Sequence, residues 1–508
     1  MVVSGHNKAS EAGVWMLRAG GNAMDAAVAT ATTLAIAIPF MNGMGGDAIG
    51  LWSDSGGRVT AINGSGRTAA AASVEAMLAK GLLALPRRGP LTVSLPGVVA
   101  AWGQSMENFG TKSWAEVLAP AIALAEEGVP LDKTSVTFFN GDEYLGLAAE
   151  FPDLAKLYGP PGSAKLGVRL KQPAAAETLR VIAREGWRSF YSGALAEFWL
   201  AQAQDAGVLL TANDLATHET LFSTPLTIDW RGLRVHVAPP NSQGIALLAL
   251  LGLSAIEPDV IKAGSGDELV DPVSYLRRKL AAFRIRDAYC ADPRRVALPA
   301  GILSEQSLSS LQCSELQPVS LSGGGDTSTL VVVDGRGNAV SWVQSLFEAF
   351  GSGVTCVGSG LVLHNRAMLE QLDDHPVRGL RGGYRTFHTL CPALVTGDKG
   401  VELAIATPGD HGQPQSILQV MRRHFEQGLD IQSAIEWPRI RHDKDKTVMI
   451  EARCPERWSE LLIEAGWKVQ VVDGWSRLMG GVNAIRRRPD GLLMGGADPR
   501  RECYALSA

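Results

Sequence analysis

The segment that follows three glycines at residues 323–325 constrains the fold more than any other part of the chain. Residues 328–334 are β-branched and apolar, as expected of a buried strand, and residues 339–345 are a second strand candidate. Between them, a Gly-Arg-Gly-Asn sequence favours a tight turn. The sequence therefore predicts a β-hairpin with Thr327 at its open end, directly after a backbone that can bend sharply.

Thr327 has two interpretations. It could simply start a buried strand, which is the more common role for such a residue, since short motif matches are only hypotheses. It could also be a nucleophile, but a threonine hydroxyl inside a chain needs a base beside it. If the chain cut itself between Asp326 and Thr327, the freed α-amine, with a pKa of about 7.7–8.0, would be that base.

The composition fits a well-buried enzyme and excludes some partners. Of the 508 residues, 46% are apolar and 19% are charged. The net charge of −5 includes no basic surplus for binding nucleic acid. The six cysteines form no CxxC pair and the nine histidines show no metal-ligand spacing. We therefore expect no disulfide framework, no metal and no organic cofactor.

The apolar run at residues 23–40 is rich in alanine and contains Asp25, so it favours a buried helix capped by Asn22 over a membrane span. Residues 1–6 have neither the basic nor the apolar region of a secretory signal. We therefore expect a cytoplasmic protein that does not contact a membrane. Probable helices on both sides of strand pairs, without repeats or long linkers, indicate one layered α/β body.

Several motifs resemble the γ-glutamyltranspeptidase family. A threonine opens a strand that ends in Val-Asp, followed by Gly-Asn-Ala-Val at 337–340 and Phe-Gly-Ser-Gly at 350–353. GGNAMDAAVA at 20–29 resembles the opening signature of the family, and Gly-Ala-Asp-Pro-Arg at 496–500 resembles its ending, with one residue fewer. The resemblance extends over nearly the whole chain.

The resemblance implies the fold of the N-terminal-nucleophile hydrolases, an αββα sandwich of layered α+β or α/β type. It implies self-cleavage into a large chain, residues 1–326, and a small chain, residues 327–508, woven into one body. It also implies that Ser345 contacts the nucleophile Thr327 and supports the cleavage.

In the family, two backbone N–H groups of a Pro-Gly-Gly turn form the oxyanion hole. Here the turn is Pro408-Gly409-Asp410, so Gly409 and Asp410 would be the donors. The second glycine is replaced by an aspartate, which brings a carboxylate into the turn. That carboxylate could repel an anionic substrate or interact with His411.

The pocket departs further from the γ-glutamyl enzymes. The arginine that binds the α-carboxylate of the substrate aligns with Gly66, and Arg67 comes one residue later. Arg67 either serves the same purpose from a shifted backbone or is a surface arginine in a salt bridge. The serine pair that supports carboxylate binding aligns with His388 and Thr389.

The three residues that hold the α-ammonium group align with Phe347, Arg366 and Leu369. A free ammonium would meet Arg366, and like charges repel. The pocket therefore keeps its capacity to bind a carboxylate and loses its capacity to bind an amine. In the alternative interpretation, Arg366 is structural and pairs with Asp373 or Asp374.

We therefore expect an amide of a small anionic acid without an α-amino group as the substrate. The sequences VQS, HNR and RTFHT resemble the branch of the family that contains oxamate amidohydrolase, and a glutaryl-type acyl group would also fit. A γ-glutamyl hydrolase or transpeptidase with a rebuilt pocket is one alternative, and an uncut, inactive homologue that binds a metabolite is another. The expected assembly is a heterodimer of the cleaved chains, or a dimer of such heterodimers.

Overall fold

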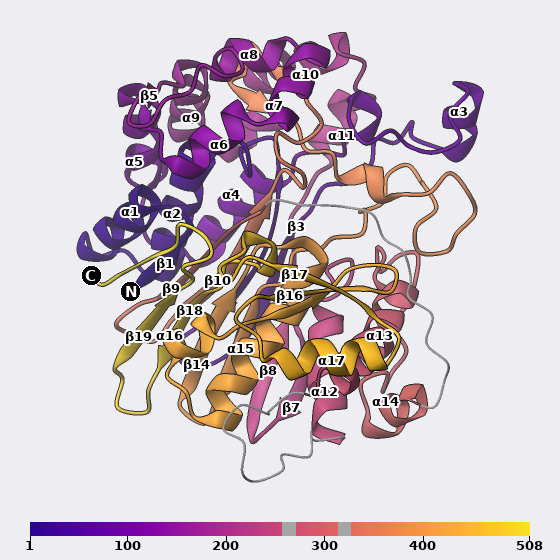
Figure 1. Cartoon of the computed structure of the whole chain (residues 1–508). Helices are drawn as coiled ribbons and strands as arrows, with labels where there is room; N and C mark the ends of the chain where they lie inside the picture. Colours follow the sequence, from indigo (N-terminus) through magenta and orange to yellow (C-terminus); the bar gives the residue numbers. More distant parts are fainter. Residues whose placement is uncertain (257–270, 313–326) are drawn as a thin grey trace.

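The computed structural model describes residues 1–256, 271–312 and 327–508. Cys313, the glycines at 323–325 and Asp326 lie outside these ranges. Two antiparallel sheets lie face to face at the centre of the molecule (Figure 1). In spatial order, the first contains β20 (Tyr504–Leu506), β1 (Val2–Ser4), β9 (Ser328–Val333), β10 (Ala339–Ser345), β2 (Asp47–Ser53), β3 (Val59–Gly64) and β6 (Leu221–Ser223). The second contains β19 (Leu493–Ala497), β18 (Asn483–Arg487), β14 (Gly400–Ala406), β13 (Ala393–Gly397), β8 (Leu233–Val237) and β7 (Leu226–Trp230).

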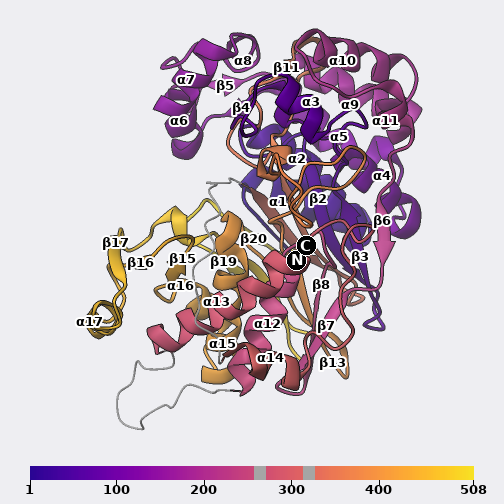
Figure 2. The same ribbon diagram turned by 90° about the vertical axis from the view of Figure 1, so that its right-hand side faces the viewer.

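Helices cover the outer face of each sheet. On the first sheet they are α1 (Asn7–Arg18), α2 (Ala23–Ala37) and α4 (Val98–Phe109), with α5 (Trp114–Glu127) packed on α2 and α9 (Pro173–Glu185) packed on α5. On the second sheet they are α12 (Gly244–Ile256), α15 (Gln413–Gln427) and α16 (Ile431–Glu436), with α13 (Pro272–Tyr289) packed on α12. Figure 2 shows the two groups of helices at opposite ends of the molecule. This is the αββα sandwich that the sequence predicts.

Smaller elements complete the two ends. Near the first sheet are α3 (Val74–Ala79), α6 (Lys133–Asn140), α7 (Asp142–Glu150), α8 (Asp153–Tyr158), α10 (Ala194–Asp205) and α11 (Ala212–Ala216). Near the second are α14 (Glu305–Gln312), α17 (Glu456–Glu464) and a small sheet of β15 (Ile440–His442), β16 (Thr447–Glu451) and β17 (Lys468–Val472). No helix within the described ranges has both the length and the apolar character to cross a membrane.

The central hairpin β9–β10 is buried on both faces. Val331 and Val333 pack between the two sheets, whereas Leu330 and Val332 pack against the helices that cover the first sheet. Because side chains alternate along a strand, one apolar run supplies both cores. Burial of each such side chain contributes roughly 1.5–3 kcal/mol to the stability, so a charge in place of Val332 would disrupt the sheet–helix interface.

Helix α2 lies against this hairpin and is entirely buried. Its alanines allow the close approach, and Asn22 caps it, with its side chain accepting from the N–H groups of Met24 (2.8 Å) and Asp25 (3.1 Å). The Asp25 carboxylate in turn accepts from the N–H of Asn22 at 2.7 Å, which completes a capping box. The structure thus confirms the predicted buried helix and its cap.

The sequence LVLHNR at residues 361–366 predicts a strand, and this prediction is wrong over most of its length. Only β12 (Leu361–Val362) is a strand, and a 3₁₀ turn, η4 (Arg366–Leu369), follows. The N–H groups of Leu363, His364 and Asn365 donate to three separate segments, at the carbonyls of Val354, Gly45 and Leu346. Among the described residues, no single strand pairs with residues 363–366, so the ladder that β12 forms does not continue.

Candidate active site

The hairpin brings the two hydroxyl residues of the predicted reaction centre together. Thr327 lies immediately before β9 and Ser345 ends β10, and both are buried. The Oγ1 of Thr327 donates to the Oγ of Ser345 at 3.2 Å. The same Ser345 oxygen accepts from the backbone N–H of Phe347 at 2.7 Å. Thr327 is therefore held at a fixed position at the open end of the hairpin.

The start of β9 is fixed by amide side chains from other elements. Asn42 donates to the Oγ of Ser328 at 2.9 Å, and Asn483 donates to the Oγ1 of Thr329 at 2.8 Å. Beside them is a cavity of about 70 Å³, and its walls include Thr327 and Pro408. That volume holds about two water molecules, so solvent can reach the threonine.

The predicted oxyanion turn has the required backbone. Gly409 has φ 119° and Asp410 has φ 52°, so both are in the left-handed region that favours glycine. Across the described residues, neither of their N–H groups donates a hydrogen bond to protein. The turn therefore has two free donors, and its Pro408 lines the same cavity as Thr327. Donors of this kind contribute roughly 3–4 kcal/mol each to a transition state.

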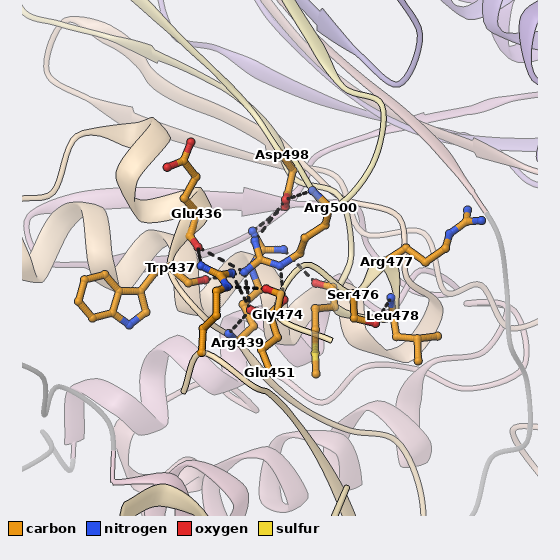
Figure 3. Close-up of polar contacts among 12 residues, drawn as sticks. Glu436, Trp437, Arg439, Glu451, Gly474, Ser476, Arg477, Leu478, Asp498 and Arg500 are labelled. Atoms are coloured by element: carbon orange, nitrogen blue, oxygen red, sulfur yellow. Dashed lines mark hydrogen bonds and ion pairs between the residues drawn. The ribbon is translucent and has the colours of Figure 1, made fainter. Parts of the chain in front are cut away.

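A buried ionic cluster fixes the segment packed against this turn (Figure 3). Arg439 donates to the carbonyl of Met479 at 2.9 Å and forms an ion pair with Asp498 at 2.7 Å. Arg500 contacts Glu451 through two nitrogens, at 2.5 and 2.6 Å. The loop after Met479 then packs on the turn, since the N–H of Gly481 donates to Thr407 Oγ1 and the Gly480 Cα approaches Gly409. The Asp-Pro-Arg segment at 498–500 therefore stabilises the loop that packs on the predicted oxyanion turn.

Arg366 lies at the centre of the predicted pocket and is fully buried. Its guanidinium lies 4.2 Å from the centre of the Phe347 ring, and its Nη1 donates to the Oγ1 of Thr389 at 3.0 Å. Burial lowers the pKa of Arg366 to about 10, against the opposing effects of Asp47 and Asp410, so it remains a cation at neutral pH. Its Nε and Nη2 have no partner within the described part of the chain.

The alternative interpretation of Arg366 as a structural ion pair is not supported. No ion pair joins it to Asp373 or Asp374 in the described ranges, and Asp373 instead accepts from the N–H of His375. Leu369, from the same 3₁₀ turn, packs with Phe347 in the core of the second sheet. Of the three residues aligned with the ammonium-binding positions, one is therefore a buried cation, one is the aromatic ring that this cation contacts, and one is a core leucine.

His388 is held by a carboxylate that the sequence did not identify. Its Nε2 lies 3.0 Å from Asp47, and Asp47 also accepts from the N–H groups of Gly66 (3.0 Å) and Gly97 (3.2 Å). Burial, aided by Arg366, lowers the pKa of His388 to about 3, so the ring is neutral at pH 7. Burial would raise the pKa of Asp47, but its charged and hydrogen-bonding neighbours hold it below its usual range.

Asp47 links this pocket to the reaction centre, because it lies opposite Ser345 in the β2–β10 ladder. Its only sequence signal is its position directly after Gly45-Gly46, where a polar residue opens a buried strand. Gln243 is a second connection that was missed. Its amide donates to the carbonyls of Thr389 (2.5 Å) and Asp410 (2.8 Å), and so joins the pocket wall to the oxyanion turn.

Arg67 lies apart from this group. Its Nη2 donates to the carbonyl of Thr217 and, at 3.1 Å, to the hydroxyl of the same residue. No hydrogen bond or ion pair connects Arg67 to Arg366 or His388 in the ranges that the structure describes. At Gly66, a side chain would collide with the carbonyl oxygen of Leu95, so an arginine cannot occupy the aligned position itself.

The two facing sheets between helical layers, with a hydroxyl residue opening the central hairpin, are the architecture of the N-terminal-nucleophile hydrolases. The family model described as Gamma-glutamyltranspeptidase matches residues 9–508, and the chain belongs to this family. Its members and the relatives below are amide-hydrolysing enzymes, and we conclude that this chain is an amide hydrolase.

Three relatives are similar over almost their full lengths. The glutathione hydrolase-like YwrD proenzyme of Bacillus subtilis is 34% identical over 100% of this chain and 98% of its own. The oxamate amidohydrolase proenzyme of Klebsiella pneumoniae is 34% identical over 98% of this chain and 97% of its own. The crystal structure of cephalosporin acylase from Bacillus halodurans superposes with a TM-score of 0.91, at 32% identity over 100% of this chain and 95% of that one.

Proposed function

We propose that this chain cuts itself between Asp326 and Thr327 and then hydrolyses a small anionic amide that lacks an α-amino group, as oxamate does. Thr327 is the nucleophile, Ser345 assists the cleavage, and Gly409 and Asp410 form the oxyanion hole. No cofactor takes part. Two similar proteins are described as proenzymes, one of them for oxamate, which supports this proposal.

The reaction follows from the positions of these groups. After cleavage, the α-amine of Thr327 accepts the proton of Oγ1 as this oxygen attacks the amide carbon. The carbonyl oxygen becomes negative and receives hydrogen bonds from the N–H groups of Gly409 and Asp410. The C–N bond then breaks, the leaving amine takes the proton, and an ester to Thr327 remains. The α-amine of Thr327 then deprotonates a water molecule, which hydrolyses the ester and releases the acid.

The observation that carries the substrate assignment is the state of Arg366. It is a fully buried cation with two nitrogens that have no protein partner among the described residues. An unpaired buried charge costs several kcal/mol unless a ligand neutralises it. A carboxylate held by Arg366 and Thr389 would satisfy these donors. The neighbouring His388 is held by Asp47 and is neutral. In this proposal Arg67 contributes to the field at the edge of the pocket.

The order of the strands supports a cleaved but undivided molecule. β9 and β10, which follow Thr327, lie between β1 and β2, which precede it. In the second sheet, β13 pairs with β8 from the earlier part of the chain. Residues 1–326 and 327–508 would thus stay together after a cut as a heterodimer, and two heterodimers could pair further.

A γ-glutamyl hydrolase is the second candidate, supported by the glutathione hydrolase-like relative. An uncut homologue that only binds a metabolite is the third. A denaturing gel distinguishes the third from the others, because an active enzyme gives two bands. Ammonia release from oxamate, measured beside anilide release from a γ-glutamyl anilide, distinguishes the first two.

Arg366→Met and Arg366→Lys test the pocket. We expect Arg366→Met to lower kcat/KM for oxamate by about 10²–10³-fold, since a desolvated charge pair contributes 2–5 kcal/mol. Arg366→Lys should recover only part of the loss, because an ammonium cannot reproduce the two-pronged geometry of guanidinium. Turnover of the anilide alone, with oxamate untouched, would show that the substrate assignment is wrong.

A further inference from the structure

The Asp410 side chain is an unexplained feature of the oxyanion turn. It is 1% exposed, and neither carboxylate oxygen has a hydrogen-bond partner within the described residues. Its φ of 52° would cost a glycine nothing, whereas a residue with a Cβ is strained by roughly 1–3 kcal/mol. Gln243 fixes the backbone by donating to the Asp410 carbonyl, so the side chain is held in this strained position.

The surroundings of Asp410 favour an interaction with an anion shared with Arg366. Arg366 also has unused donors, and the two side chains are within electrostatic range of each other without forming an ion pair. His411 Nε2 lies 3.8 Å from Asp410 Oδ2, beyond hydrogen-bond distance. The other charged groups that face Asp410 are Arg286 from α13, and Arg441 and Asp443 from β15 and the residues after it.

We propose that Asp410 is a specificity-determining residue that, as a neutral carboxylic acid, donates a hydrogen bond to the substrate carboxylate bound at Arg366. The substrate then binds together with one proton taken from solvent. This inference rests on the proposed function and adds a second acid-binding group to the same pocket. When protonated, Asp410 has one O–H donor to add to the unused N–H donors of Arg366, and the oxygens of one substrate carboxylate can accept from both residues.

The electrostatics agree with this geometry. Burial raises the pKa of Asp410 to about 6, and Asp443 adds to this effect, whereas Arg441, Arg366 and Arg286 oppose it. A second anion placed beside Asp410 would raise its pKa further, because two neighbouring carboxylates cannot both ionise easily. Binding of an anion and protonation of Asp410 are therefore coupled. A substrate with a free ammonium group would instead prefer the ionised form.

The test uses oxalate, the acid that oxamate hydrolysis would release, and the self-cleaved enzyme. Calorimetric titration at pH 7.5 in phosphate and in Tris, whose ionisation enthalpies differ, counts the protons taken up with each oxalate. We expect an uptake close to one proton, and an affinity that falls up to about tenfold per pH unit above pH 6. Asp410→Asn keeps a donor but cannot ionise, so its uptake should be smaller and its affinity should depend less on pH.

Asp410→Gly distinguishes the contribution of the Asp410 side chain from that of its backbone. It keeps the N–H and relieves the strain, but we expect about tenfold weaker oxalate binding than in Asp410→Asn. If oxalate binds to the wild-type enzyme without proton uptake, and this binding still depends on Arg366, the role of Asp410 is overturned but the proposed function is not. Oxalate binding that is absent, or unchanged in Arg366→Met, would overturn the proposed function as well. The α-amine of Thr327, with a pKa of about 7.7–8.0, also takes up part of a proton at pH 7.5 when an anion binds nearby. The decisive quantity is therefore the proton uptake of the wild-type enzyme minus that of Asp410→Asn or of Asp410→Gly, and either variant suffices if the other folds poorly.

Discussion

Two regions meet at Phe347 and are built on opposite principles. On one side is the reaction centre, where Thr327, Ser345 and the N–H of Phe347 are neutral groups with satisfied hydrogen bonds. On the other side, the pocket places Arg366 and Asp410 in the interior with unused bonding capacity. This difference is consistent with the proposed function, in which the groups around Thr327 cleave the amide and the buried charges of the pocket select the acyl group.

Replacement of Thr327 by alanine should have the largest effect, because it removes the nucleophile of both the self-cleavage and the hydrolysis. We expect a single band on a denaturing gel and a loss of about 10⁴-fold or more in kcat. Thr327→Ser retains a hydroxyl and an amine, so it should still be cut. A chain that stays intact and yet hydrolyses oxamate at full rate after Thr327→Ala would refute the role of this residue.

Arg500→Met tests whether the reaction centre depends on the ionic cluster behind it. The change leaves Glu451 buried with one fewer cation, which should destabilise the fold by about 3–5 kcal/mol and slow the self-cleavage. Thermal unfolding and the time course of cleavage measure these effects. Arg457→Met is a matched control, since its pair with Glu460 lies at the surface, where such pairs contribute little to stability. Equal effects of both changes would show that the cluster has no special role.

His388→Gln examines the pocket through the pH dependence of stability. The pKa of His388 is about 3 in the folded chain and about 6.5 when unfolded. Between these values only the unfolded chain binds the proton, so stability falls as the pH decreases from 6.5 towards 3. In a Thr327→Ala background, His388→Gln should reduce this slope by up to about 1.4 kcal/mol per pH unit. The exposed His375→Gln is the control, and an unchanged slope in His388→Gln would contradict the assignment.

The sequence predicted the reaction centre better than the pocket, and the reason is physical. Thr327 and Ser345 lie on strands joined by a short turn, so alternation and turn residues suffice to place them together. The sequence also predicts a hairpin over residues 48–63 and a helix from Gln413, and the structure confirms both, since local patterns determine them.

The pocket depends on contacts that no local pattern contains. Asp47 and His388 are separated by 341 positions, and Gln243 joins two loops that are distant in the sequence. Residues 361–366 have the composition of a strand, but within the described ranges the pairing ends at Val362, so the propensity of residues 363–366 is misleading. Resemblance to the family supplied Arg366 and His388, but their charge state and free donors required the structure.

The smallest effect is expected from substitution of Arg67, which tests whether this residue belongs to the pocket. Both hydrogen bonds of its Nη2 go to Thr217, so its contribution to binding would act through the electrostatic field alone. Such an effect is screened near the surface, and we expect Arg67→Gln to change kcat/KM for oxamate by about threefold or less. Measurement at low and high salt should show the change shrinking as salt increases. A loss comparable to that of Arg366→Met would instead mean that Arg67 turns towards the substrate, and that the pocket extends across the bridge between Arg67 and Arg385.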